Sequence, residues 1–491
     1  MKIFNRKPFY AAVLTALSAL GAAQSAKAVN INPNGLGQVL IYPYYTVRTS
    51  SSTVATGAQN TYISITNSKP VGKAIKVRFL EGKNAREVLS FNLFLSAGDV
   101  WTGAVVPTTA ADAPGAGSAK LITADKSCTY GVVTASPGIP FSNFAYTGDL
   151  GGDSLDRTNE GYVEMIEMGE ITHAGLLSAI NHVNGVAPCT PATLAAADAA
   201  GLAGYLSTGT GGLFGGASLI NPSTGVDYTY DAVALEAWDA TVGGQPSAGP
   251  STTPNLATGS STTSLVLFNG TFKTATWGGA NASRDAVSAA MMRNNVINEY
   301  VLDSATNSAT DWVVTFPTKR FYINGATAAA RQPFANTFGA SGSCDVVSVN
   351  ASALASSGLF SREEQFASPG GGFTILTYPS FSLCWKTNVM TFRPAVAGTS
   401  NIFGSTNLIR MAGDGLNPFD TAFNNGWMKL GFLQPTMILT PVVSSTNGVA
   451  DVTVQSYYGL PVIGFMAQSF VNSLISSFGG NFVHKYSLAI Q

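Results

Sequence analysis

The 491-residue chain is poor in charge: Asp, Glu, Lys and Arg together make up 11% of it, against about 25% in an ordinary soluble domain. Its 26 basic and 27 acidic residues nearly cancel, so it lacks the basic excess that is typical of nucleic-acid-binding proteins. Low charge with 10% aromatic residues also argues against a disordered chain, and the scarcity of Glu and Lys against a coiled coil. What remains is a large, weakly charged globular protein with ample material for a core.

Cysteine is also scarce, and the four that occur lie far apart: Cys128, Cys189, Cys344 and Cys384. None falls in a CxxC pair or at a Cys/His spacing typical of zinc sites. In an oxidising compartment, an even set of distant cysteines predicts two disulfides. We expect Cys128–Cys189 and Cys344–Cys384, because this pairing keeps each bridge within one region of the chain. Buried free thiols are the alternative.

The first 28 residues have the pattern of an export signal. Three basic residues among the first seven precede a short apolar stretch at 11–23, and Ala-Lys-Ala at 26–28 has the small-x-small form that signal peptidase cuts. We predict a mature N-terminus at Val29. The apolar stretch is too short to span a bilayer, which disfavours the alternative of an uncleaved membrane anchor.

A second stretch that raises the question of a membrane is 452–483, which carries no charged residue. Pro461, Gln468 and the Gly479-Gly480 pair make it a poor transmembrane helix. We therefore expect no transmembrane helix after signal cleavage. An outer-membrane β-barrel is a less favoured alternative, since the C-terminus lacks the terminal aromatic residue that is common in such barrels.

Short runs of alternating polar and apolar residues dominate the chain, separated by Gly, Asn and Ser. Residues 74–80, 88–95 and 161–168 are examples. This period of two predicts a mainly β protein with the architecture of an antiparallel β-sandwich, Ig-like or jelly-roll-like, and a few short helices inserted in the middle. We expect one face of each strand to be buried and the other to face water.

We divide the chain into four parts: a signal peptide at 1–28, an N-terminal β-sandwich region at 29–170, a mixed insertion at 171–310, and a C-terminal β region at 311–491. The strand patterns on both sides of the insertion lead us to expect that the N- and C-terminal regions share one core.

The insertion carries the helical signals. Residues 191–205 are rich in Ala and Leu, and Ser283 is placed as the N-cap of a helix over 285–300, which contains no Gly or Pro. Residues 206–262 are rich in Gly, Ser and Thr and have few charges. We expect them to form either a long surface excursion or a set of poorly signalled strands.

No catalytic constellation emerges, and we expect that the protein is not an enzyme. Residues 152–155 (Gly-Asp-Ser-Leu) match the motif at the nucleophile of a family of esterases, but a loop precedes Ser154 and no Asp-x-x-His pair follows it. The chain has three histidines, His173, His182 and His484, for which we expect capping or solvated positions.

Four acidic residues lie close together in one Gly-containing loop: Asp149, Asp153, Asp156 and Glu160. Carboxylates at such spacing can supply the oxygen ligands that Ca²⁺ prefers, so we predict a calcium site here, with 414–420 as a second, weaker candidate. The spacing is not that of an EF-hand. Asx turns, in which these side chains bond their own backbone, are the alternative. Calcium is the one cofactor that the sequence indicates.

Exposed aromatic side chains could form a platform for a sugar, and Tyr42, Tyr44, Tyr45 and Trp101 are the candidates. At strand spacing, however, aromatic residues usually belong to the core. Both interpretations stay open at this point.

Five stretches of the chain resemble a group of proteobacterial proteins. They are 86–93, 98–101, 156–169, 310–317 (TDWVVTFP) and 459–465 (GLPVIGF). The group consists of secreted or surface-exposed β-rich proteins with no assigned activity. The resemblance touches both ends and the middle of the chain, so it implies a single architecture and export to the cell envelope. It brings no catalytic residues with it.

These observations favour a structural protein at the cell surface or in the extracellular matrix of a Gram-negative bacterium. We expect it to self-assemble, as a surface-layer or filament subunit does, because unprotected strand edges associate through backbone hydrogen bonds. The alternative is a secreted β-sandwich that binds a glycan or another ligand of the cell envelope. A hydrolase that uses Ser154 is the least favoured hypothesis.

Overall fold

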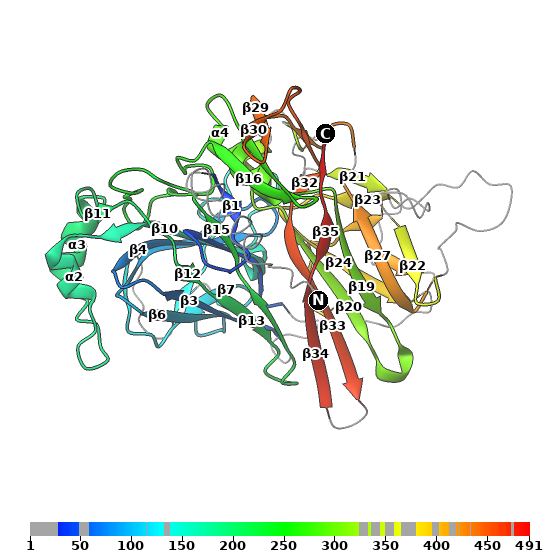
Figure 1. The fold of residues 1–491 in the computed structure, drawn as a ribbon. Helices are drawn as coiled ribbons and strands as arrows, with labels where there is room; N and C mark the ends of the chain where they lie inside the picture. Colours follow the sequence, from blue (N-terminus) through cyan, green and yellow to red (C-terminus); the bar gives the residue numbers. More distant parts are fainter. Residues whose placement is uncertain are drawn as a thin grey trace, which may run out of the picture.

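The computed structural model describes residues 28–48, 58–113, 115–131, 138–323, 332–334, 344–348, 358–364, 380–394, 402–411, 419–421, 423–432, 434–472 and 476–491. Within these residues the chain is mainly β, with several antiparallel sheets and a few short helices (Figure 1). The predicted fold class is confirmed. Apart from Ala28, the predicted signal peptide lies outside the described residues.

Two sheets of the N-terminal half pack face to face as a sandwich. In spatial order, the eight-stranded sheet contains β1 (Asn30–Ile31), β15 (Val233–Glu236), β2 (Val39–Thr46), β10 (Glu160–Ile171), β4 (Lys73–Glu81), β5 (Glu87–Leu95) and β8 (Cys128–Tyr130), with β11 (Leu206–Ser207) paired to β10. The seven-stranded sheet contains β14 (Asp227–Asp231), β13 (Gly216–Ile220), β3 (Asn60–Asn67), β6 (Val100–Pro107), β7 (Ala119–Ile122) and β9 (Ile139–Pro140), with β12 (Leu213–Phe214) paired to β3. Alternate residues of facing strands, such as Ile63, Trp101 and Val163, fill the space between the sheets.

The Gly/Ser/Thr-rich segment was expected to form either a surface excursion or poorly signalled strands. Over residues 206–236 the second interpretation is correct. They are strands, and they complete both sheets of the sandwich: β12 and β13 pair with β3, and β15 pairs with β2. The polar composition hid these strands because their alternate residues face solvent. Residues 237–262 follow without regular structure, yet Trp238 and Leu256 within them are fully buried.

Six smaller sheets lie in the rest of the described part of the chain. A five-stranded sheet contains β26 (Phe419–Thr421), β24 (Thr387–Pro394), β20 (Ala309–Thr315), β33 (Ile463–Asn472) and β34 (Ser476–Val483). One four-stranded sheet contains β22 (Gly358–Ser361), β27 (Asn425–Gly431), β19 (Asn295–Val301) and β35 (Lys485–Ser487). A second contains β16 (Thr263–Phe268), β17 (Thr271–Thr276), β29 (Val443–Thr446) and β30 (Val449–Ala450). One three-stranded sheet contains β21 (Asp345–Ser348), β23 (Ser380–Leu383) and β25 (Arg410–Met411), and another contains β28 (Ile438–Leu439), β31 (Tyr457–Tyr458) and β36 (Ala489–Ile490). The two-stranded sheet pairs β18 (Met292–Arg293) with β32 (Leu460–Pro461).

The two halves of the chain pack against each other through continuous cores. Val313 of β20 and Phe465 of β33 join the core of the N-terminal sandwich, where Phe465 stacks on Tyr230 at a ring distance of 4.8 Å. On the other side of the eight-stranded sheet, Tyr162 and Ile166 belong to the core of the C-terminal half. Figure 1 shows the sandwich and the C-terminal sheets lying side by side.

This packing corrects one expectation about the eight-stranded sheet. All nine residues of β4 are buried, and all but one of the twelve residues of β10. The polar positions of these strands therefore do not face water as predicted. Residues 237–262 and the C-terminal half cover that face: the Lys76 ammonium donates to the carbonyls of Ala248 and Gly249, at 2.6 and 2.8 Å.

The helices are short: η2 (Leu155–Asn159), α2 (Ala174–Ile180), α3 (Pro191–Ala199), α4 (Ala282–Met291), η3 (Ser304–Thr306) and α5 (Lys319–Tyr322). The helix predicted over 191–205 is present as α3 but ends at Ala199, and turns occupy 200–205. The one predicted over 285–300 is wrong in its second half, where β18 and β19 replace it. Strand β19 pairs with β27 on one side and β35 on the other, so ladder hydrogen bonds outweigh the helical pattern. The N-cap is Asn281, and the Ser283 hydroxyl donates to the Ala257 carbonyl instead.

Both predicted disulfides are confirmed. Cys128 is bonded to Cys189, and Cys344 to Cys384. They indicate an oxidising environment outside the cytoplasm. Among the described residues, no helix is long and apolar enough to cross a membrane.

Candidate functional site

The predicted calcium ligands lie just before and within β10, but arginines occupy their carboxylates. Asp149 is buried and accepts two hydrogen bonds from the Arg157 guanidinium, at 2.8 and 2.7 Å. Glu160 is also buried and accepts from Arg48 Nε at 2.7 Å and from the Tyr44 hydroxyl at 2.9 Å. Both carboxylates are thus already balanced by a cation of the same chain.

Asp153 and Asp156 lie at the exposed part of the same loop. Asp156 pairs with Arg48 at 2.8 Å; partial burial opposes ionisation, but the hydrogen bond and charge of Arg48 outweigh it and lower the pKa of Asp156. The backbone carbonyl of Asp153 accepts from Asn143. Within the described ranges, no group of three or more His, Cys, Asp and Glu side chains is placed to hold a metal ion. Calcium at this loop therefore stays a prediction without such a group of side chains to support it. The candidate at 414–420 lies largely outside the described residues, and calcium there stays a prediction.

Buried ion pairs continue across the covered face of the eight-stranded sheet. Arg78 of β4 donates to Glu87 and to Glu164 of β10, at 2.9 Å each, and Glu164 also accepts from Arg320 at 3.0 Å. Buried charge is not confined to this face or to ion pairs. The buried charged residues are Lys73, Lys76, Arg78, Glu81, Glu87, Asp112, Lys120, Asp149, Arg157, Glu160, Glu164, Glu167, Asp239, Arg284, Arg293, Asp311, Lys319, Arg320, Asp345 and Lys386.

Sequence reasoning missed this buried ionic layer. Lys76 and Arg78 alternate with apolar residues, which is also the pattern of a strand with one wet face. Only the opposite charges on β10 could have hinted at pairing, and nothing in a single sequence places β4 beside β10.

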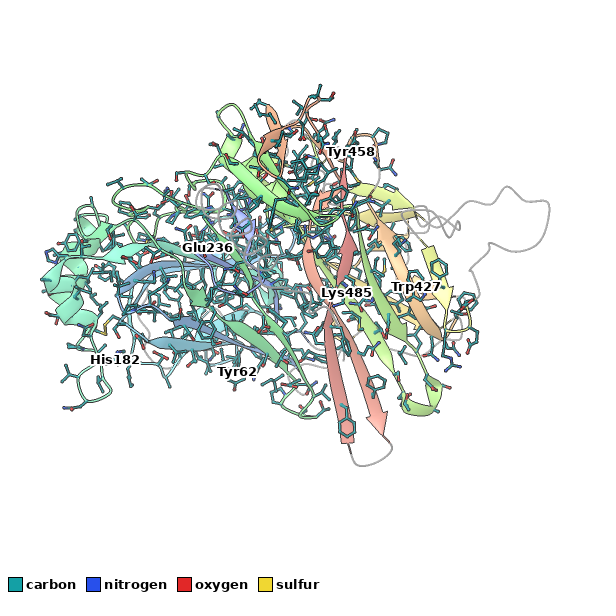
Figure 2. The ribbon with its side chains drawn as sticks, in the orientation of Figure 1. Tyr62, His182, Glu236, Trp427, Tyr458 and Lys485 are labelled. Carbon is teal, nitrogen blue, oxygen red and sulfur yellow. A yellow bond between two sulfur atoms is a disulfide. The ribbon has the colours of Figure 1, made fainter. Side chains whose placement is uncertain are left out.

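A groove of about 900 Å³ lies on the open face of the seven-stranded sheet, beside the loop between β1 and β2. Tyr62 of β3 and Phe214 of β12 line it and are 51% and 43% exposed. Ser64, Thr102 and Asp231 add hydroxyl and carboxylate groups. Figure 2 labels Tyr62 on this side of the molecule. Exposed rings beside hydroxyl and carboxylate groups are the side chains that sugar ligands contact.

The predicted sugar platform is not at this groove's surface. Tyr42, Tyr44, Tyr45 and Trp101 are all fully buried, so the alternative interpretation, that they belong to the core, is confirmed. The signal that sequence reasoning overlooked is Tyr62. It alternates with Ile63 and therefore has to face the side opposite to the core.

The hairpin of β33 and β34 is a second candidate surface. Strand β34 pairs with β33 over all eight of its residues, and no described strand pairs with its other edge. Phe478 and Phe482 are 54% and 57% exposed, and Figure 1 shows the hairpin extending past the neighbouring sheets. The opposite face of β34 packs on β14: a Cβ at Gly479 would lie 2.3 Å from the Asp227 carbonyl oxygen, so only glycine fits there.

The remaining predicted candidates have local roles. Ser154 caps η2, where its hydroxyl accepts from the Asp156 N–H at 3.2 Å. His173 caps α2 in the same way, and His182 lies 3.7 Å from Asp99. His484 is buried, which lowers its pKa to about 4.

No protein-family model, no curated protein and no solved structure matches the chain.

Proposed function

We propose that the protein is an exported structural component of the cell surface or extracellular matrix of a Gram-negative bacterium, and that it assembles with copies of itself. The role is non-catalytic. The observation that carries this proposal is the exposed edge of β34. Natural proteins usually protect such edges with lysine, proline or a bulge, because an unpaired edge is a template for another strand.

Strand β34 has none of these protections. Ser476–Val483 contains no charge and no proline, and its exposed face presents Phe478 and Phe482. Asn298 Nδ2 donates to the Phe482 carbonyl at 3.0 Å, so the free edge runs from Ser476 towards Asn481. The occupant that we propose is the same hairpin of a second copy, which would supply both the backbone partners and apolar surface for the two rings.

Sedimentation velocity and negative-stain electron microscopy of the purified exported chain test this proposal. We expect assembly that depends on concentration, and Phe478→Lys shifts it to concentrations at least about tenfold higher, a loss of about 1.4 kcal/mol in association. Phe272→Lys is the matched control, because Phe272 is 53% exposed on a different sheet. A wild-type chain that stays monomeric at every concentration would contradict self-assembly, and an equal effect of both variants would contradict the hairpin as its site.

A second function, glycan binding, is favoured by the groove around Tyr62. Tyr62→Ala and Phe214→Ala should each weaken retention on a glycan array. Phe144→Ala serves as the control, because Phe144 is 64% exposed and does not line the groove. Silence of the wild-type chain on the array would remove this candidate.

A further inference from the structure

Lys386 and Asn84 are 302 residues apart in the chain and meet inside the protein. Backbone hydrogen bonds hold the two segments together: the N–H groups of Lys386 and Thr387 donate to the Gly82 carbonyl, at 3.0 and 2.8 Å. Asn84 lies in the turn between β4 and β5, where its own N–H donates to Glu81 Oε1 at 2.8 Å. The positions of both side chains are therefore set by the backbone on either side.

The side chains form a short chain of contacts with a carboxylate at its end. Lys386 Nζ donates to Asn84 Oδ1 at 3.0 Å, and Asn84 Nδ2 donates to Asp149 Oδ2 at 3.0 Å. All three residues are at most 2% exposed. An ionised carboxylate only accepts hydrogen bonds, so Asp149 fixes which side of the Asn84 amide is nitrogen and turns the carbonyl oxygen towards Lys386.

The surroundings favour the neutral amine of Lys386. Burial is the largest cause and lowers its pKa to about 7; Lys319 and Arg86 lower it further, while Glu81 and Asp149 oppose the shift. A buried lysine that is partly unprotonated near neutral pH is a nucleophile, which an ordinary surface lysine is not.

We propose that Lys386 and Asn84 join in an intramolecular amide cross-link, with Asp149 as the group that moves the proton. Lys386 Nζ attacks Asn84 Cγ, and the Nζ–Cγ bond forms. Asp149 takes a proton from Nζ and delivers it to Nδ2, the Cγ–Nδ2 bond breaks, and ammonia leaves. One amide and one amine give one amide and ammonia, so no oxidant, reductant or other reactant is needed.

Asp149 is held at the leaving nitrogen by the guanidinium of Arg157. Arg157 binds both of its oxygens, and the Arg157 guanidinium lies 3.9 Å from the centre of the Tyr146 ring. Proximity of amine, amide and carboxylate in a closed site supplies the effective concentration that makes such a slow reaction possible. The cross-link would tie the β4–β5 turn of the sandwich to the start of β24 in the C-terminal half.

A second buried lysine provides a matched control. Lys76 of β4 is the cross-strand partner of Asn92 in β5, and Asn92 Nδ2 lies 3.5 Å from Asp198. Burial lowers the pKa of Lys76 to about 7 as well, but its ammonium donates to the carbonyls of Ala248 and Gly249. This residue has the same chemistry as Lys386 but points at backbone carbonyls, so no cross-link is expected there.

Mass spectrometry of the full exported chain tests the proposal. After reduction, alkylation and denaturation, the intact mass should be lower by one ammonia molecule than the mass calculated for the mature sequence with four alkylated cysteines. A tryptic digest should contain a branched peptide that joins residue 84 to residue 386. Because these measurements need only the wild-type chain, the test does not depend on any variant folding. An intact mass without the loss, or a loss located at another pair of residues, would overturn the proposal.

The variants then assign the roles. Lys386→Gln and Asn84→Ala should abolish the loss of ammonia, while Lys76→Gln should retain it. Asp149→Asn should slow or abolish formation of the branched peptide. Undiminished cross-linking in Asp149→Asn would overturn the role of this carboxylate. The result is independent of self-assembly, since it is read on denatured single chains.

Discussion

The two sheets of the N-terminal sandwich have similar alternating sequences, but their outer faces have opposite surroundings. The outer face of the seven-stranded sheet is open, and Tyr62 there is half exposed beside the groove. The outer face of the eight-stranded sheet is covered by the rest of the chain, and Arg78 and Glu164 there form buried ion pairs. Alternation thus tells which residues share a face, whereas the surroundings of that face depend on distant parts of the chain.

Removing one partner of a buried ion pair should be among the changes that lower stability most. Arg78→Ala leaves Glu87 and Glu164 buried with less compensation, so we expect the free energy of unfolding to fall by about 3–5 kcal/mol. Urea denaturation of the exported, disulfide-bonded chain measures this. Arg362→Ala is the control: Arg362 and Glu363 form an ion pair with side chains 71% and 62% exposed, so its loss should cost less than about 1 kcal/mol. Equal effects would contradict the contrast between covered and open surfaces.

The buried carboxylate of Asp311 provides a second test of the difference between covered and open surfaces, since no described cation pairs with it. Asp311 of β20 is fully buried, and burial raises its pKa to about 7, although the Phe403 N–H donates to its Oδ2 at 3.1 Å and opposes the shift. The unfolded chain releases this proton near pH 4. Between about pH 4 and about pH 7 the native state therefore holds a proton that the unfolded state has lost, so the free energy of unfolding falls as pH rises through this window.

Asp311→Asn removes this ionisation. The difference in free energy of unfolding between the variant and the wild type should shift in favour of the variant by up to about 1.4 kcal/mol for each pH unit between about 4 and about 7. Above that window the difference should stay constant. Urea denaturation at a series of pH values measures the difference. Asp153→Asn, which replaces an exposed carboxylate of the acidic loop, is the control for the loss of one negative charge. Parallel pH profiles of Asp311→Asn and wild type would show that Asp311 is ionised in the folded protein.

The smallest effect on stability is expected on the open face. Tyr62→Ala should change the free energy of unfolding by less than about 0.5 kcal/mol, as surface substitutions usually do. Trp101 faces the opposite side of the same sheet and is 1% exposed, so Trp101→Ala should cost about 3–5 kcal/mol. The two variants distinguish an effect on binding from an effect on stability. Loss of ligand binding in Tyr62→Ala would come from the lost contact in the groove, whereas in Trp101→Ala it would come from unfolding. A large destabilisation by Tyr62→Ala would contradict an open face.

Much of the fold could be predicted because its signals are local. The alternation at 74–80 and 161–168 predicted β4 and β10, and the cysteine positions predicted both bridges. The helix over 285–300 was half wrong, because its second half is held by β27 and β35, which lie more than a hundred residues later in the chain. Local spacing carries no information about such partners.

The candidate sites were harder to predict for the same reason. Asp149 and Glu160 have the spacing of oxygen ligands, but they form ion pairs with Arg157 and Arg48 instead. Lys386, Asn84 and Asp149 carry no recognisable motif, since they come from three distant segments and meet only in the folded protein. A sequence lists nucleophiles and carboxylates without their distances, and distance decides their chemistry.

The sequence by itself determined the β-rich class and the two faces of each strand, because these follow from composition and from a period of two residues along the backbone. The tertiary structure decided which of those faces meets water. It did so because the covering of a sheet is a contact between segments hundreds of residues apart. That covering buries charge over one sheet, leaves Tyr62 in an open groove over the other, and brings Lys386 to Asn84.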